Sequence, residues 1–418
     1  MARRQQASPP TAERAVRAPS ADRDDLLDEE ALLAAARART GLEDFGDPSF
    51  REPLRRLLWS IEHEARLTPA GRAGQHARIV GLLVARLQTR ALLASHPEIE
   101  NEKVAVRFVV VGFPRTGTTL LHRLLARDPR TSALAWWECR HPAPLPGWSA
   151  AEAKRVRDPR LAVAEAEVAA MLAGNPALAA VHPLDALAPD EDVMLLEHAF
   201  QSSPPAGSMN VPSYLRWHLE ADGRPAYAEH ARLLRSLQWQ KRVRGEAVGP
   251  FVLKAPHHML HLDRLFEQHP EATVIQTHRD PIDTLPSLAS MALELRRLSS
   301  DAVEARACAD YALTTARARI ERLERVRRTV GEARFVDVWF GDVVQKPLEV
   351  VDRIYARIGL ELPDATRAEM ARFVAENGRD RRPAHGYTLS EFGLEAEAIA
   401  REFAAYREAH VLPYQRPD

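Results

Sequence analysis

The residues best suited to chemistry lie between Gly112 and Thr119, which read GFPRTGTT. Two glycines, one arginine and three threonine hydroxyls occupy these eight positions. Backbone N–H groups of a glycine loop and the start of a helix commonly bind a phosphate-like anion. The spacing is close to the phosphate-loop pattern G-x-x-x-x-G-K-[ST], but Thr118 stands at the lysine position and the positive charge lies at Arg115. The segment therefore predicts an anion site without the usual triphosphate lysine.

A strand and a helix must flank this loop. Residues 108–111 are an unbroken apolar run, typical of a parallel strand that is buried on both faces. From Thr118 onward, four leucines fall on one face of a predicted helix. We therefore expect the order strand, glycine loop, helix, which brings backbone N–H groups and a helix N-terminus to one point.

The PRTGTT segment resembles the 5′-phosphosulfate loop of sulfotransferases that use 3′-phosphoadenosine 5′-phosphosulfate (PAPS). In that family a basic residue follows the proline, and Gly-Thr-Thr surrounds the 5′-phosphate. The resemblance implies a cofactor-binding set here of Arg115, Thr116, Gly117, Thr118 and Thr119. The alternative is a degenerate loop that serves folding alone.

A second motif, TVIQTHRDPIDTLPS, covers residues 273–287. Residues 273–277 are predicted to form a strand, and Arg279 follows its C-terminal end, where ligands of open α/β sheets bind. In the resembling family an arginine at a strand end and a serine eight positions later bind the 3′-phosphate of PAPS. Arg279 and Ser287 have this spacing. The alternative for Arg279 is a surface ion pair with Asp280 or Asp283.

Another short strand is predicted in FVLKAP, residues 251–256, and it ends at Lys254. Lys254 is expected at the same edge of the sheet as Arg115. The resemblance implies that this lysine supports the sulfuryl group during transfer, with Arg115 stabilising charge beside it.

Two kinds of side chain are candidates for the general base. Glu138 follows an apolar, aromatic stretch, where burial would raise its pKa, and it resembles the catalytic glutamate of tyrosylprotein sulfotransferases. A buried salt bridge with Arg140 is the alternative. His257 or His258 is the other candidate, because histidine is the base in the cytosolic small-molecule sulfotransferases.

The sequence does not favour a metal site. His257, His258 and His261 lie close together, but no H-E-x-x-H pattern or other ligand set accompanies them. The acids in Ala188–Asp192 are interpreted as first-turn residues of a helix. An aromatic region that contains Tyr214 and His218 suits either an acceptor pocket or core packing.

The composition is typical of a globular chain, and the net charge is close to zero. The 418 residues are 45% hydrophobic with a formal charge of −1, which gives no sign of nucleic-acid or membrane affinity. The two cysteines are far apart in sequence, so neither a disulfide framework nor a cysteine metal site is indicated. No apolar run approaches a membrane span and no secretory signal is recognised, so a cytoplasmic protein is expected.

The predicted fold is an α/β three-layer sandwich with a central parallel sheet, like that of P-loop NTPases. Residues 1–24 are predicted to be a disordered tail and 25–100 a helical region. Residues 101–418 are predicted to be the catalytic domain, with a helical insertion on the acceptor side at about 140–248. The basic segment 381–387 is interpreted as a cover over the nucleotide or as a solvated loop.

The resemblance implies that a sulfuryl group passes from PAPS, as co-substrate, to a hydroxyl or amine by in-line displacement with a general base. The acceptor, a small molecule or a peptide, and the oligomeric state are left open. Two other functions compete with this one. An ATP-dependent kinase would need a magnesium ligand, for which Asp280 or Asp337 is available, but it lacks the loop lysine. A non-catalytic nucleotide-binding protein would not need Arg115, Lys254 and Arg279 together.

Overall fold

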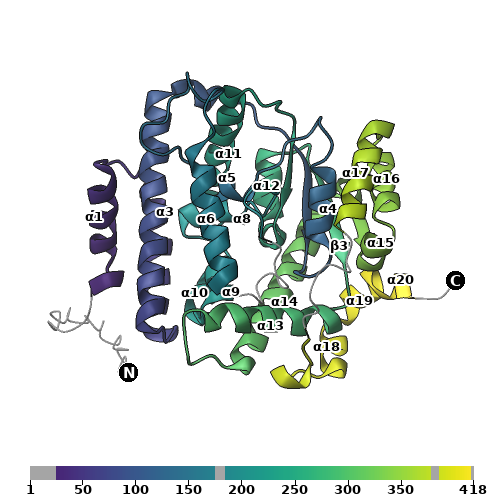
Figure 1. Cartoon of the computed structure of the whole chain (residues 1–418). Coiled ribbons are helices and arrows are strands. Elements are labelled where there is room, and N and C mark those ends of the chain that lie inside the picture. Colours follow the sequence, from purple (N-terminus) through teal and green to yellow (C-terminus); the bar gives the residue numbers. More distant parts are fainter. Residues whose placement is uncertain (1–24, 175–183, 378–385, 416–418) are drawn as a thin grey trace, which may run out of the picture.

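Four short parallel strands form the centre of the molecule in the computed structural model, which describes residues 25–174, 184–377 and 386–415 (Figure 1). Their order across the sheet is β2-β1-β3-β4. The strands are β1 (Val106–Gly112), β2 (Phe251–Lys254), β3 (Thr273–His278) and β4 (Phe335–Trp339). The predicted parallel sheet is confirmed, and β1, β2 and β3 lie close to their expected positions.

The register of the strands brings the predicted motifs to one edge of the sheet. Val110 of β1 pairs with Lys254 of β2, and Gly112 pairs with Thr277 of β3. The strands are parallel, so their C-terminal ends lie at the same edge. The glycine loop, Lys254 and Arg279 therefore meet there, although they come from three separate parts of the sequence.

Helices cover both faces of the sheet, as expected for strands without a polar face. Phe108 and Val110 of β1 join one core cluster with apolar residues of α4 (Thr118–Leu125), α16 (Pro347–Arg357) and α17 (Asp364–Glu376). The alternate residues Val109 and Val111 join a second, larger cluster on the other face. The predicted three-layer arrangement follows from this alternation.

The N-terminal region is helical and packs into the larger cluster. It contains α1 (Glu29–Thr40), α2 (Arg51–Glu64) and α3 (Pro69–Ser95). Leu32, Leu54 and Leu83 of these helices belong to the same core cluster as Val109. The buried Arg86 of α3 also donates to three backbone carbonyls, including that of His198 at 3.1 Å. These helices thus share one apolar core with the sheet.

The remaining helices follow β1 in the sequence. Between β1 and β2 lie, besides α4, the helices α5 (Trp136–Arg140), α6 (Pro159–Gly174), α8 (Val193–Leu196), α9 (Pro204–Ser208), α10 (Pro212–Glu220) and α11 (Arg224–Arg244). A 3-10 helix, η5 (Pro256–Leu260), follows β2, and further along the chain are α12 (Leu262–Gln268), α13 (Pro281–Arg297), α14 (Ala305–Val330), α15 (Phe340–Gln345), α18 (Ala396–Glu402), α19 (Ala404–His410) and α20 (Leu412–Gln415).

Two predictions fall on residues outside the described ranges, namely the tail 1–24 and most of the basic segment, residues 381–385. Within the described ranges, no helix combines the length and apolar character that a bilayer crossing requires.

Candidate active site

The glycine loop turns sharply between β1 and α4. Gly117 has φ of +84°, in the left-handed region that favours glycine, and it directly precedes Thr118 at the start of α4. At Gly112 a Cβ atom would lie 2.1 Å from Oγ1 of Thr277, so this position has no room for a side chain. Thr116 Oγ1 donates to the carbonyl of Phe113 at 2.6 Å. The loop is therefore held closed from within, with the N-terminus of α4 facing the edge of the sheet.

Arg115 is the one loop residue other than glycine in the left-handed region, with φ of +72°. Its carbonyl accepts a hydrogen bond of 3.0 Å from Nη1 of Arg279. The two predicted cofactor-binding motifs, 164 residues apart in sequence, are thus in direct contact. The hydrogen bond stabilises an unusual backbone conformation at the point where the anion is expected.

Arg279 lies between the loop and α13. Its guanidinium stacks over the ring of Phe340 at 4.4 Å, and Nε is 3.5 Å from a carboxylate oxygen of Asp283. Of the two predicted ion-pair partners, Asp283 is thus found near it. Asp280 instead caps α13 and binds Arg407 of α19. Ser287 is buried in α13, two turns beyond this cap.

Lys254 connects the glycine loop to an acidic segment that precedes α8. Its side chain is fully buried, and Nζ lies 3.4 Å from Oγ1 of Thr119 and 2.8 Å from a carboxylate oxygen of Glu191. Glu191 retains 26% side-chain exposure. A carboxylate that solvent can reach is therefore held beside the predicted anion site by a buried lysine.

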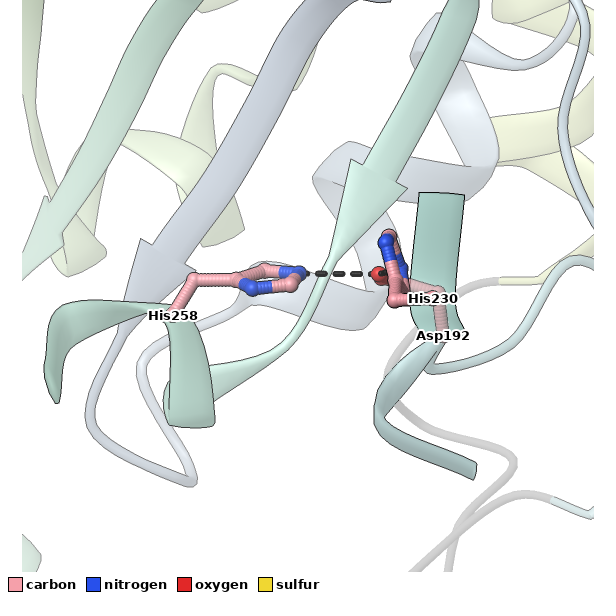
Figure 2. Close-up of side chains that lie close together, drawn as sticks. All are labelled: Asp192, His230 and His258. Carbon is pink, nitrogen blue, oxygen red and sulfur yellow. Dashed lines mark hydrogen bonds and ion pairs between the residues drawn. The ribbon is translucent and has the colours of Figure 1, made fainter. Parts of the chain in front are cut away.

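Asp192, the next residue, stabilises the strand that carries Lys254. Its Oδ1 accepts from the backbone N–H of Lys254 at 2.9 Å, and its Oδ2 accepts from Nε2 of His230 and of His258, both at 2.8 Å (Figure 2). Tyr227 hydrogen-bonds to the other ring nitrogen of His258 at 2.7 Å. Burial raises the pKa of Asp192, but attraction to His258 and the two histidine hydrogen bonds outweigh it and hold this pKa well below its usual range.

This arrangement corrects the interpretation of Ala188–Asp192 as an ordinary helix start. Asp192 is the N-cap residue of α8, but its side chain makes no capping hydrogen bond. Its carboxylate is engaged in the buried network, and Glu191 is engaged with Lys254. The run of acids is visible in the sequence, but its role is not. The partners of these acids come from β2, η5 and α11, which are distant in sequence.

His257 precedes His258 in η5 and has a different partner. It is buried, and its Nδ1 hydrogen-bonds to Oγ of Ser203 at 2.9 Å. Burial, with the neighbouring His218 and His261, holds the pKa of His257 well below its usual range. His257 is therefore neutral at physiological pH, whereas its neighbour His258 faces Asp192.

Glu138 is a buried member of α5 with several partners. Its carboxylate lies 2.6 Å from Nη2 of Arg244 and 2.8 Å from Nζ of Lys241, both in the last turns of α11. It also accepts from the backbone N–H of Ala135 at 3.1 Å. The predicted alternative, a buried salt bridge of Glu138, is found, but Arg140 is not the partner because it pairs with Glu167.

Two groups of metal-type ligands occur among the described residues: Asp192 with His230 and His258, and Asp337 with His278 and His410. In the first group the oxygen-to-nitrogen separations of 2.8 Å are hydrogen-bond distances. Ligands around a tetrahedral zinc ion with bonds of about 2.0–2.1 Å would stand roughly 3.3 Å apart. As arranged here, the group is a hydrogen-bonded network that holds the end of β2 through the backbone of Lys254.

Comparison with solved structures gives close agreement in fold. The sulfotransferase STF1 from Mycobacterium tuberculosis H37Rv superposes with a TM-score of 0.79 and 30% identity, covering 92% of this chain and 100% of that one. The sulfotransferase STF9 from Mycobacterium avium gives a TM-score of 0.81 and 29% identity, covering 93% and 98%.

Sequence comparison gives the same family. The omega-hydroxy-beta-dihydromenaquinone-9 sulfotransferase Stf3 of Mycobacterium bovis, and that of Mycobacterium tuberculosis, are 26% identical over 269 residues, or 60% of this chain. The match spans 62% of the length of these curated relatives. The model of the Sulfotransferase family matches residues 107–364, a segment that includes the glycine loop, Lys254 and Arg279. This match covers more than half of the chain, so the chain belongs to the sulfotransferase family.

Proposed function

We propose that this protein transfers a sulfuryl group from PAPS to a hydroxyl group of a small acceptor. The observation that carries the proposal is the contact between Arg279 and the Arg115 carbonyl, which joins the two predicted phosphate sites at one sheet edge. One nucleotide with phosphates at both the 5′ and 3′ positions would engage both motifs. The name of the Stf3 relative, which acts on a hydroxylated menaquinone, supports a hydroxyl as the acceptor.

The loop residues bind the 5′-phosphosulfate in this proposal. The backbone N–H groups of Thr116, Gly117, Thr118 and Thr119 surround the phosphate at the N-terminus of α4, where the helix dipole favours negative charge. Arg115 supplies a positive charge beside them. Arg279 and Ser287 bind the 3′-phosphate, and the fork of donors on the guanidinium gives the contact its geometry.

Lys254 and Glu191 carry out the transfer step. Glu191 takes the proton of the acceptor hydroxyl, whose oxygen forms the new bond to sulfur. The bond between sulfur and the bridging oxygen of the 5′-phosphate breaks, and 3′-phosphoadenosine 5′-phosphate leaves with the electron pair. Lys254, already within 3.4 Å of Thr119, turns from Glu191 toward the charge that develops on this leaving group.

Glu191 is preferred to Glu138 and His257 as the base because of its surroundings. It is the acidic partner of Lys254 and is partly exposed, so an acceptor can reach it. Both carboxylate oxygens of Glu138 are engaged by cations of α11. His257 is only 1% exposed and is hydrogen-bonded to Ser203, so an acceptor reaches it less readily than Glu191.

A kinase is less well supported by the same contacts. The two aspartates available for magnesium both bind arginines, Asp280 to Arg407 and Asp337 to Arg327. Recruiting either carboxylate to a metal would break a largely buried ion pair.

Thermal unfolding in the presence of nucleotides tests the proposed function. A ligand that binds only the folded state adds roughly 2.7 kcal/mol at about 100 times its dissociation constant. Metal-free 3′-phosphoadenosine 5′-phosphate should raise the melting temperature more than AMP or ATP does. If only ATP with magnesium stabilises the protein, a kinase is favoured. If none of these nucleotides stabilises it, the proposed nucleotide site is wrong.

A further inference from the structure

The junction between β3 and α13 carries both residues that are proposed to bind the 3′-phosphate. Arg279 lies in this junction, directly after β3, and Ser287 lies in α13. Asp280 is the N-cap residue of α13, and its Oδ1 accepts from the backbone N–H of Ile282 at 3.0 Å. The backbone from His278 to Asp280 therefore sets where both phosphate-binding side chains stand relative to the glycine loop.

Both sequence neighbours of Arg279 are bound by the short helix α19. Arg407 donates to the carboxylate of Asp280, from Nε to both oxygens at 3.1 Å and from Nη2 to Oδ2 at 2.9 Å. Tyr406 hydrogen-bonds through its hydroxyl to Nδ1 of His278 at 3.0 Å. Two consecutive side chains of one helix thus hold the residues on either side of Arg279.

Tyr406 also reaches the glycine loop. Its ring packs edge-on against that of Phe113, with centroids 6.1 Å apart, and both residues are buried. On the next turn of α19, the ring of His410 stacks on that of His278 at 4.5 Å. One helix therefore contacts both nucleotide motifs, although the family match ends at residue 364, before α19 begins.

The contact between Arg407 and Asp280 is suited to positioning more than to stability. The Asp280 side chain is 6% exposed and that of Arg407 is 19% exposed. Removing such a pair of charges from water is costly, and apolar residues of similar volume often give equal or greater stability. The fork of the guanidinium and the carboxylate instead meet in one geometry, which fixes the two segments relative to each other.

We propose that Arg407 is a positioning residue for the 3′-phosphate site, acting through Asp280 with the support of Tyr406. This inference rests on the proposed function. Arg407 holds the junction so that Arg279 can reach the 3′-phosphate while its Nη1 keeps the 3.0 Å hydrogen bond to the carbonyl of Arg115. Loss of Arg407 should therefore weaken the contact with the 3′-phosphate and leave the contacts of the glycine loop with the 5′-phosphate in place.

The ratio of two affinities tests this proposal. Calorimetry gives the preference of each protein for 3′-phosphoadenosine 5′-phosphate over AMP, and a loss of folded protein affects both ligands equally. Arg407→Met should reduce this preference by about tenfold or more, while AMP binds almost as it does to the wild type. Arg407→Lys, which keeps a charge beside Asp280, should recover part of the preference. An unchanged preference in Arg407→Met would show that Arg407 serves stability alone and would overturn the proposal.

Two further variants complete the experiment. Tyr406→Phe removes the hydroxyl that bonds to His278 but keeps the ring, so it should fold normally and lower the preference by a smaller factor, even if the first variant does not fold. The control Arg317→Met breaks a surface ion pair between α14 and Glu402 of α18, and it should keep the wild-type preference. An unchanged preference in Tyr406→Phe, or an equal loss in Arg317→Met, would contradict the proposal. If the wild type itself does not prefer the bisphosphate, the proposed function fails, and this inference fails with it.

Discussion

The side-chain nitrogen of Lys254 lies 2.8 Å from the carboxylate of Glu191. Both lie at the edge of the sheet where the glycine loop leads into α4. Lys254 is fully buried, whereas Glu191 is partly exposed, so the pair has one fixed member and one that an acceptor can approach. In the proposed mechanism, Lys254 turns toward the leaving group of bound PAPS, and the carboxylate of Glu191 is left free to accept a proton.

The first prediction concerns this proton. Glu191→Gln should lower kcat by about 10²–10⁴-fold because the amide cannot accept the proton. Binding of 3′-phosphoadenosine 5′-phosphate should be unchanged. Transfer of label from ³⁵S-PAPS to an acceptor that the wild-type enzyme sulfates measures the first quantity, and calorimetry measures the second.

Glu138→Gln is the matched variant for this experiment. It should lower the melting temperature, because Arg244 and Lys241 lose their buried counter-charge, and the folded fraction should keep its turnover. Loss of turnover in Glu138→Gln together with normal turnover in Glu191→Gln would return the role of base to Glu138.

The second prediction concerns the buried network in Figure 2. Asp192→Asn removes the charge that accepts from His230, His258 and the Lys254 backbone, so it should lower the free energy of unfolding by about 3–5 kcal/mol. Urea unfolding measures the change. Asp185→Asn, at an exposed aspartate whose side chain accepts a local backbone hydrogen bond, should cost less than about 0.5 kcal/mol. Equal costs would show that the network contributes nothing to stability.

The sequence predicted the parts of the site that are local motifs. The glycine loop, Lys254 and Arg279 each lie at the C-terminal end of a recognisable strand, and parallel strands necessarily bring these ends together. The network of Asp192 was not predicted, because His230 and His258 are 38 and 66 residues away in sequence. Nothing in the local sequence pattern distinguishes Asp192 from an ordinary helix cap.

The burial of Arg319 in α14 was missed for a different physical reason. In an amphipathic helix such as α14, an arginine normally belongs to the solvated face, and the burial of Arg319 depends on tertiary packing that the local pattern does not reveal. Glu138 was recognised as a buried acid, but its cations lie more than 100 residues away in α11. Burial and charge balance across long separations therefore could not be predicted from the sequence alone.

The third prediction concerns the close approach at the glycine loop. Gly112→Ala would place a Cβ atom 2.1 Å from Oγ1 of Thr277, so the loop must move and nucleotide binding should fall at least tenfold, equivalent to about 1.4 kcal/mol. Gly81→Ala is the control, because a Cβ there meets nothing within 4 Å in the interior of α3. It should stabilise the protein by about 0.5–1 kcal/mol and leave binding unchanged. Normal nucleotide affinity in Gly112→Ala would contradict the assigned loop geometry.

The fourth prediction concerns pH. Burial lowers the pKa of His218 to about 3, well below 6.5. Between these values the unfolded chain binds more protons than the folded protein, so stability falls as the pH is lowered from about 6.5. At pH 5 one such histidine costs about 2 kcal/mol. His218→Phe, which preserves the stacking on Tyr214, should remove this share of the acid sensitivity. Urea unfolding at pH 7 and pH 5 measures it, and an unchanged difference between the two pH values would contradict the prediction.

The most direct test of the central claim is calorimetric binding of 3′-phosphoadenosine 5′-phosphate and of AMP to the wild-type protein and to Arg279→Ala. The two ligands differ only in the 3′-phosphate that Arg279 is proposed to bind. We predict that the wild-type protein prefers the bisphosphate strongly and that Arg279→Ala loses most of this preference while binding AMP almost as before. Equal losses for both ligands, or no preference in the wild-type protein, would contradict the assignment of the site to PAPS.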